Sequence, residues 1–124
     1  MTEKIKILVA EDNDNQRLLY EQELLEEGYD IIIAKNGQEA VEQVLSQKPQ
    51  LVILDIQMPG MNGIETLNEI LNYNQQLPII LHTAYSNYKD NFMSWAADAY
   101  VVKSSNLNDL KTQIKKVLKN RGLL

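Results

Sequence analysis

The sequence predicts an α/β protein in which a doubly wound sheet of five parallel strands is covered by helices on both faces. The first observation behind this prediction is a series of five short apolar runs rich in β-branched residues. Each run is nearly continuous in apolar character rather than alternating, which is typical of parallel strands that are buried on both faces. The predicted strands are residues 5–10, 31–34, 51–54, 79–81 and 100–102.

Segments with the spacing of amphipathic helices separate these runs and provide the second observation. Apolar residues recur at helical spacing around residues 18–25, 40–45, 64–71 and 110–118, and Phe92, Trp95 and Ala96 share the same spacing. Strand and helix therefore alternate as (βα)5, the pattern of a doubly wound sheet. In such sheets, ligands bind beyond the carboxyl ends of the strands.

Turn and cap residues agree with this order of elements. Gly28 is placed to end the first helix, and Asn36 stands where the second helix should begin. Either Asn106 or Asn108 is expected to cap the last helix.

Length and composition limit the classes of protein to consider. The chain has 124 residues, of which 44% are hydrophobic, and suits one globular domain spanning residues 1–124. It has no cysteine and one histidine, which excludes disulfide frameworks, thiolate metal sites and most imidazole clusters. A net charge of −5 disfavours direct binding to nucleic acid. No apolar run suits a membrane span or a signal peptide, so a cytoplasmic protein is the default expectation.

Charged and hydroxyl side chains follow four of the predicted strands: Glu11, Asp12, Asp55, Thr83 and Lys103. Three carboxylates at neighbouring strand ends repel one another, and at about 4 Å and an effective dielectric constant of about 20 each pair costs on the order of 4 kcal/mol. A retained proton or a bound cation would relieve this repulsion. Hard oxygen ligands that leave room for water and a phosphate oxygen suit Mg²⁺ best, so Mg²⁺ is the expected cofactor.

Each of these residues has a structural alternative when it is taken singly. Asp12 could cap a helix, Asp55 could cap a turn, and Thr83 suits a strand because it is β-branched. The combination with Lys103, whose ammonium can reach Asp55 or an incoming phosphoryl oxygen, favours a reactive site. A carboxylate in such a site can attack phosphorus and form an aspartyl phosphate. Spacing alone does not decide whether Asp55 or Asp12 is the nucleophile.

Four blocks of the sequence resemble the receiver domains of bacterial two-component systems. They read LVAEDN from Leu8, LVILDIQMPGMNG from Leu51, TA at Thr83 and Ala84, and YVVK from Tyr100. The blocks stand in the family's order, and the third-strand block is highly specific. The resemblance implies the flavodoxin-like strand order 2-1-3-4-5.

The resemblance implies that Asp55 is the phosphoacceptor and that a histidine kinase or a histidine phosphotransfer protein is the donor. Thr83 and Lys103 would bind the phosphoryl group. The protein would catalyse its own phosphorylation and dephosphorylation, but it would be a signalling protein rather than an enzyme. The implied metal ligands are Glu11, Asp12, Asp55 and the backbone carbonyl of Gln57.

A switch is also implied by the resemblance. Thr83 would move toward the phosphoryl group, the loop from Ala84 to Tyr88 would follow, and Tyr100 would turn inward. Moving the populations from 1:99 to 99:1 requires ~5.5 kcal/mol. The face formed by the predicted fourth helix, the fifth strand and the last helix would then act on a downstream protein or an output domain. Dimerisation through the fourth and last helices remains an open alternative.

Several positions depart from the family pattern. Glu11 replaces an aspartate, so its longer side chain is expected to reach the metal through water. Ser104 stands where proline usually follows the lysine, commonly in a cis peptide, which leaves the Lys103-Ser104 geometry open. Ala96 replaces the usual glycine. Gln57 and Tyr85 are large residues beside the site and are expected to slow hydrolysis of the aspartyl phosphate.

Three alternative functions fit the sequence less well. A phosphatase of the haloacid-dehalogenase type needs a second aspartate two residues after the nucleophile, where this chain has Gln57. A flavodoxin-like flavin binder needs a phosphate-binding loop after its first strand, where this chain is acidic. A degenerate receiver that acts only in protein interactions would not need the full set of site residues. His82 is expected to be structural, because it points to the opposite face from Thr83.

Overall fold

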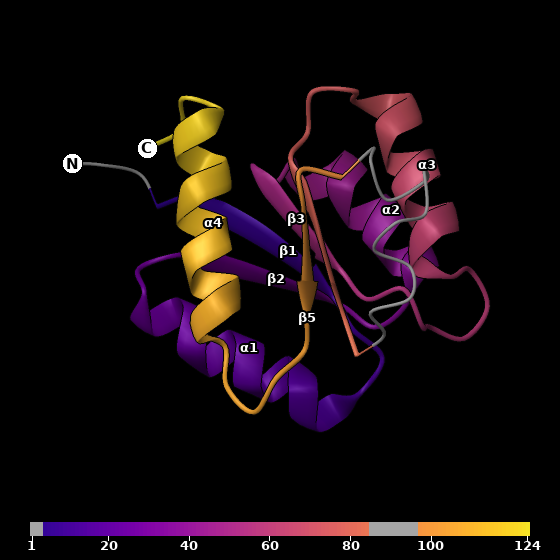
Figure 1. Ribbon diagram of the computed structural model, residues 1–124. Helices are drawn as coiled ribbons and strands as arrows, with labels where there is room; N and C mark the ends of the chain where they lie inside the picture. The colour runs from indigo at the N-terminus through magenta and orange to yellow at the C-terminus, as the bar shows by residue number, and fades with distance from the viewer. Residues whose placement is uncertain (1–3, 85–96) are drawn as a thin grey trace.

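A computed structural model describes residues 4–84 and 97–124 of the protein. Five parallel strands form one sheet in the order β2-β1-β3-β4-β5, which confirms the predicted fold class and strand order (Figure 1). The strands are β1 (Lys6–Ala10), β2 (Asp30–Ala34), β3 (Leu51–Leu54), β4 (Ile79–Thr83) and β5 (Ala99–Val102).

Four described helices cover the two faces of the sheet, with α1 and α4 on one face and α2 and α3 on the other (Figure 1). The helix predicted around Phe92, Trp95 and Ala96 lies outside the described residues, as do Tyr85 and Tyr88. Within the described part of the chain, none of the helices has the length and apolar character that crossing a bilayer requires. The helices are α1 (Asp14–Glu26), α2 (Gly37–Gln47), α3 (Gly63–Tyr73) and α4 (Asn108–Asn120).

Two apolar layers explain why the strands are continuous in apolar character. Ile7 and Val9 of β1 pack in the layer beneath α1 and α4, whereas Leu8 and Ala10 pack in the layer beneath α2 and α3. Successive strand residues point to opposite faces. Both faces are covered, so every residue of β3 and β4, and every residue of β1 after Lys6, is buried, and the polar residues lie at the strand ends.

Side-chain caps fix where the helices begin. Asn13 accepts a hydrogen bond from the Gln16 backbone, and Asn36 opens α2 as predicted. Gly28 ends α1 with a positive φ of 92°, also as predicted. The prediction for the last helix is wrong in detail.

Neither predicted asparagine is the N-cap residue of α4. Leu107 occupies that position and makes no side-chain cap, and Asn108 is the first helical residue. Asn106 instead accepts a hydrogen bond from the Asn108 backbone at 2.9 Å, from one position further upstream. The amide side chain therefore satisfies a free helix donor without standing at the cap.

Candidate functional site

Three carboxylates meet at the carboxyl edge of the sheet, where the sequence places them. Glu11 follows β1 and is 1% exposed, and Asp55 follows β3 and is 7% exposed. Asp12 is exposed beside them. One oxygen from each of the three lies within 4.8 Å of the other two, a spacing that allows them to hold one metal ion.

Lys103 brings a positive charge to these acids from the end of β5. Its ammonium donates hydrogen bonds to Glu11 Oε1 at 2.5 Å and to Asp55 Oδ2 at 2.8 Å. The contact with Asp55 is the predicted one, whereas the contact with Glu11 was not anticipated. Lys103 therefore joins two acids that are 44 residues apart in the sequence and that follow neighbouring strands.

The pKa values of Glu11 and Lys103 both lie above their usual values, for different reasons. Burial raises the pKa of the Glu11 carboxyl by more than the hydrogen bond from Lys103 lowers it, and nearby Asp55 raises it further. Burial lowers the pKa of the Lys103 ammonium, but its hydrogen bonds to Asp55 and Glu11 outweigh burial and leave that pKa above the usual value. Glu11 therefore holds its proton more tightly mainly because it is buried, whereas Lys103 does so because it donates hydrogen bonds to two carboxylates.

Thr83 ends β4 beside the backbone of Lys103, whose N–H donates to the Thr83 carbonyl at 2.7 Å. Its side chain is fully buried, and no partner for its hydroxyl oxygen lies within hydrogen-bond reach in the described part of the chain. A buried hydroxyl without a partner is costly and calls for an explanation. An oxygen-rich ligand at the site would supply the missing partner.

The remaining predicted site residues belong to the segments after β3 and β4 and to β5. The Gln57 backbone N–H donates to Asp55 Oδ1 at 3.1 Å, and the Gln57 side chain is exposed. Ala84 is exposed after Thr83, and Tyr100 is half-buried on β5. Tyr85, predicted to screen the site, lies outside the described residues.

The loop after Asp55 is held by a close approach of two backbone segments. The Gly63 N–H donates to the Ile56 carbonyl at 2.9 Å. A methyl group at Gly63 would clash with the carbonyl oxygen of Asp55 and would lie 2.6 Å from Ile56 Cα. Glycine is therefore required here by space. The described peptide bonds are all trans, and this settles the Lys103-Ser104 geometry that the sequence left open.

A second buried polar pair, which sequence reasoning missed, lies between α1 and β4. Tyr20 and His82 are 1% and 2% exposed, and the Tyr20 hydroxyl lies 2.5 Å from His82 Nδ1. Burial raises the pKa of Tyr20, helped by the charges of Glu11 and Asp55. The phenol therefore keeps its proton, and its O–H donates a hydrogen bond to Nδ1 of the neutral imidazole. His82 is structural, as predicted, but it has a specific partner.

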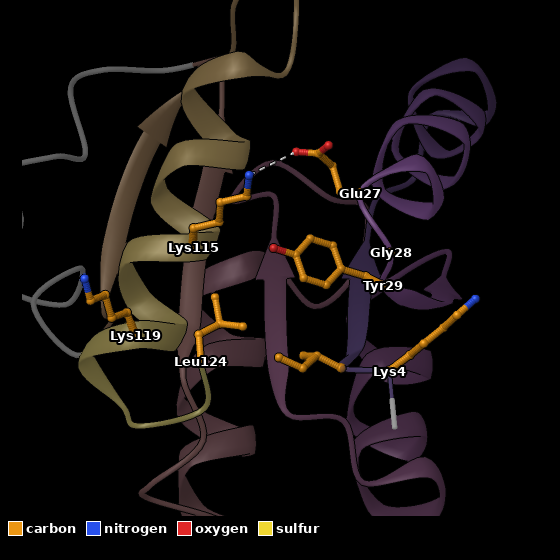
Figure 2. A pocket seen from close by; sticks show the side chains of 8 residues that line it. Lys4, Glu27, Gly28, Tyr29, Lys115, Lys119 and Leu124 are labelled. Carbon is orange, nitrogen blue, oxygen red and sulfur yellow. Dashed lines mark ion pairs between the residues drawn. The ribbon is translucent and has the colours of Figure 1, made fainter. Parts of the chain in front are cut away.

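A cavity lies at the opposite edge of the sheet, and its side chains do not converge. It has a volume of about 550 Å³ and lies between the start of β1 and the end of α4. Figure 2 shows Lys115 reaching toward Glu27, at 3.6 Å, while the ammonium groups of Lys4 and Lys119 point away from Tyr29. The chemically capable groups of the described chain therefore gather at the carboxyl edge.

Comparison with known proteins shows the family to which this chain belongs. Residues 7–115 match the response regulator receiver domain family, and the matched stretch contains all of the predicted site residues. The chain belongs to this family. The haloacid-dehalogenase-type phosphatase and the flavin binder are therefore set aside for this receiver domain.

Individual relatives agree with the family assignment. The response regulator ArlR of Staphylococcus saprophyticus is 36% identical over 118 residues, which are 94% of this chain and 53% of ArlR. The chain spans about half the length of the curated relatives it matches. TrrA of Thermotoga maritima, crystallised in complex with Mg²⁺-BeF, is 50% identical with a TM-score of 0.89, covering 92% of this chain and 99% of TrrA. TrrA in complex with the histidine kinase ThkA gives a TM-score of 0.86 at the same identity, covering 92% and 98%.

Proposed function

We propose that this receiver domain is a phosphoacceptor switch of a two-component or phosphorelay system, with Asp55 as the phosphoacceptor. The observation that carries the proposal is the position of the Lys103 ammonium, which donates hydrogen bonds to both Glu11 and Asp55. The complexes of TrrA with Mg²⁺-BeF and with a histidine kinase support the same role for this relative.

The acidic set fits a hard divalent cation. Its ligand atoms are carboxylate oxygens that lie close together, and ionised Glu11 is disfavoured by its surroundings. Asp12 and Asp55, with the backbone carbonyl of Gln57, would hold Mg²⁺, and Glu11, engaged with Lys103, would reach it through water. When bound, Mg²⁺ supplies positive charge that offsets the negative charge on the transferring group.

The chemical step uses the carboxylate of Asp55 as nucleophile. One of its oxygens forms a bond to phosphorus as the bond from phosphorus to the donor histidine nitrogen breaks, and the electron pair stays on that nitrogen. Charge accumulates on the three phosphoryl oxygens during transfer. The Lys103 ammonium, which contacts Asp55, and the Thr83 hydroxyl, at the end of the neighbouring strand, would stabilise that charge.

The output of the switch would pass through β5 and α4. A hollow of about 310 Å³ lies between these elements and is lined in part by Tyr100, Asp109 and Thr112. Tyr100 packs against the apolar layer beneath α2 and α3 and is half-buried, so its side chain has room to turn further inward or outward. Phosphorylation would shift Thr83, Ala84 and Tyr100 together and change this face for a partner.

The wider setting follows from the same role. Residues 1–124 would form one receiver domain that works in the cytoplasm as a signalling protein, accepting phosphoryl groups from a histidine kinase or a histidine phosphotransfer protein. Its target would be an output domain or a separate protein, without nucleic-acid contacts of its own. Whether it forms a homodimer is open to measurement by comparing its mass in solution with and without beryllium fluoride.

Incubation with acetyl phosphate tests the proposal directly. With Mg²⁺ present, the intact mass should rise by one phosphoryl group, and chelation of the metal should prevent the gain. Asp55→Asn should abolish the gain because the nucleophile is lost. Asp30→Asn, an exposed acid at the start of β2 and away from the carboxyl edge, is the matched control and should be phosphorylated like the wild type.

Two outcomes would contradict the proposal. A wild-type protein that folds but gains no mass would be a degenerate receiver. A mass gain that survives Asp55→Asn would place the phosphoryl group elsewhere, with Asp12 as the next candidate.

A further inference from the structure

The end of β4 is supported on one side only. The register between β3 and β4 ends at the pair Leu54 and Leu81. β4 continues for two more residues, His82 and Thr83, which are paired with β5 alone. The segment that carries the Thr83 hydroxyl therefore has a backbone neighbour toward Lys103 and no register partner toward Asp55.

The hydrogen bond between Tyr20 and His82 supports this segment from α1. It joins two fully buried side chains, and their rings meet edge to face at 5.5 Å with an interplanar angle of 73°. The bond is kept because leaving either buried group unpaired is costly, and it depends on the angle between donor and acceptor. It therefore restrains the position and the rotation of His82.

Restraint of His82 is also restraint of Thr83. The two residues are adjacent on one strand, and their side chains point to opposite faces of the sheet. Because the imidazole is held against α1, the Thr83 side chain is directed to the opposite face of the sheet. The unpartnered Thr83 oxygen is the group whose aim decides how well it meets a ligand oxygen.

We propose that Tyr20 and His82 are positioning residues, which act through Thr83 to set how strongly the site binds a phosphoryl group. The inference rests on the proposed function and adds two residues of α1 and β4 to it. The hydrogen bond of the Tyr20 hydroxyl is made to His82 and not to one of the proposed metal ligands. Its effect is carried by the last two residues of β4.

A double-mutant cycle tests this coupling. Beryllium fluoride serves as a stand-in for the phosphoryl group. Its binding in the presence of Mg²⁺ is measured by calorimetry for the wild-type chain, Tyr20→Phe, Thr83→Ala and the double variant. Tyr20→Phe should weaken binding by about threefold to tenfold, the range that the loss of one hydrogen bond produces. In the Thr83→Ala background the same substitution should change binding by less than about twofold, because the residue it acts through is gone.

Two further variants separate positioning from stability. Tyr73→Phe, an exposed tyrosine of α3, should bind like the wild type. Tyr20→Phe leaves His82 unpaired and will lower stability, so the variant Tyr20→Phe with His82→Leu removes both polar groups and keeps the layer apolar. This variant should show the same weakened binding at a temperature where it is folded.

The outcomes distinguish the inference from the proposed function. If Tyr20→Phe weakens binding equally with and without Thr83, or leaves it unchanged, the positioning role is wrong while the phosphoacceptor role stands. If the wild type itself does not bind beryllium fluoride in a way that depends on Asp55, the proposed function fails.

Discussion

His82 makes the stability of this receiver domain depend on pH in a defined window. Burial, helped by the Lys103 ammonium and opposed by Asp55, lowers the pKa of His82 from 6.5 to about 4. The folded protein therefore keeps the imidazole neutral at a pH where the unfolded chain already protonates it. Stability from this group is complete above pH 6.5 and is lost as the pH falls toward about 4.

The size of the effect follows from the two pKa values. The difference between 6.5 and about 4, at roughly 1.4 kcal/mol for each pH unit, corresponds to about 3 kcal/mol. About 2 kcal/mol of this should already be lost near pH 5. The imidazole is 2% exposed, so solvent screening does not reduce the figure strongly.

Urea unfolding from about pH 7 to about pH 4 measures this loss, with His82→Asn as the matched variant because its amide does not titrate. Carboxylates titrate in the same range, and subtracting the two curves removes their part. The chain has a single histidine, so the imidazole signals in a proton NMR titration need no assignment. The reasoning is refuted if those signals titrate near 6.5 in the folded protein, or if both proteins lose stability in parallel.

Three further predictions follow from the site. Without Mg²⁺, Lys103→Met should lower the free energy of unfolding, measured with urea, by about 3–5 kcal/mol, because the buried acids lose their counter-charge. Added Mg²⁺ should recover part of the lost stability, and an unchanged urea midpoint would contradict this. Gly63→Ala should cost about 1–3 kcal/mol in the same assay because its methyl group meets backbone near Ile56, whereas a neutral effect would mean that the loop yields. Gln57→Ala with Tyr85→Ala should speed decay of the phosphorylated mass, and an unchanged rate would refute their screening role.

The fold was predictable because its signals are local and repeated. Each strand is a continuous apolar run, and Asn36 and Gly28 mark helix ends by their own conformational preferences. Strand β4 was predicted two residues too short because His82 and Thr83 are polar, although both are buried. The hydrogen bond from Tyr20 makes burial of His82 tolerable. That partner is 62 residues away in the sequence, and no local pattern announces it.

The site was predictable to the level of residues but not of contacts. The rule that ligands gather at the carboxyl ends of parallel strands selects Glu11, Asp55 and Lys103. It does not say that Lys103 lies closer to Glu11 than to Asp55, since that depends on side-chain length and on the register of three strands. Arg17, whose guanidinium donates to the Glu11 carbonyl at 2.8 Å, was also missed. Its position in the first turn of α1, five residues after Asp12, is a signal that could have identified it.

The backbone around the site explains why a change of charge at Asp55 should act on β4 rather than on the other strands. The Asp55 N–H donates to the Ala10 carbonyl, and the Glu11 N–H donates to Ala34, so the ladder continues past the ends of β1 and β3. Gly63 further fixes the backbone beside Asp55. Only the β3–β4 register stops short, before Thr83. A phosphoryl group on Asp55 would therefore meet a continuous backbone ladder on one side and, on the other, a strand end that is held only by β5 and by the Tyr20–His82 hydrogen bond.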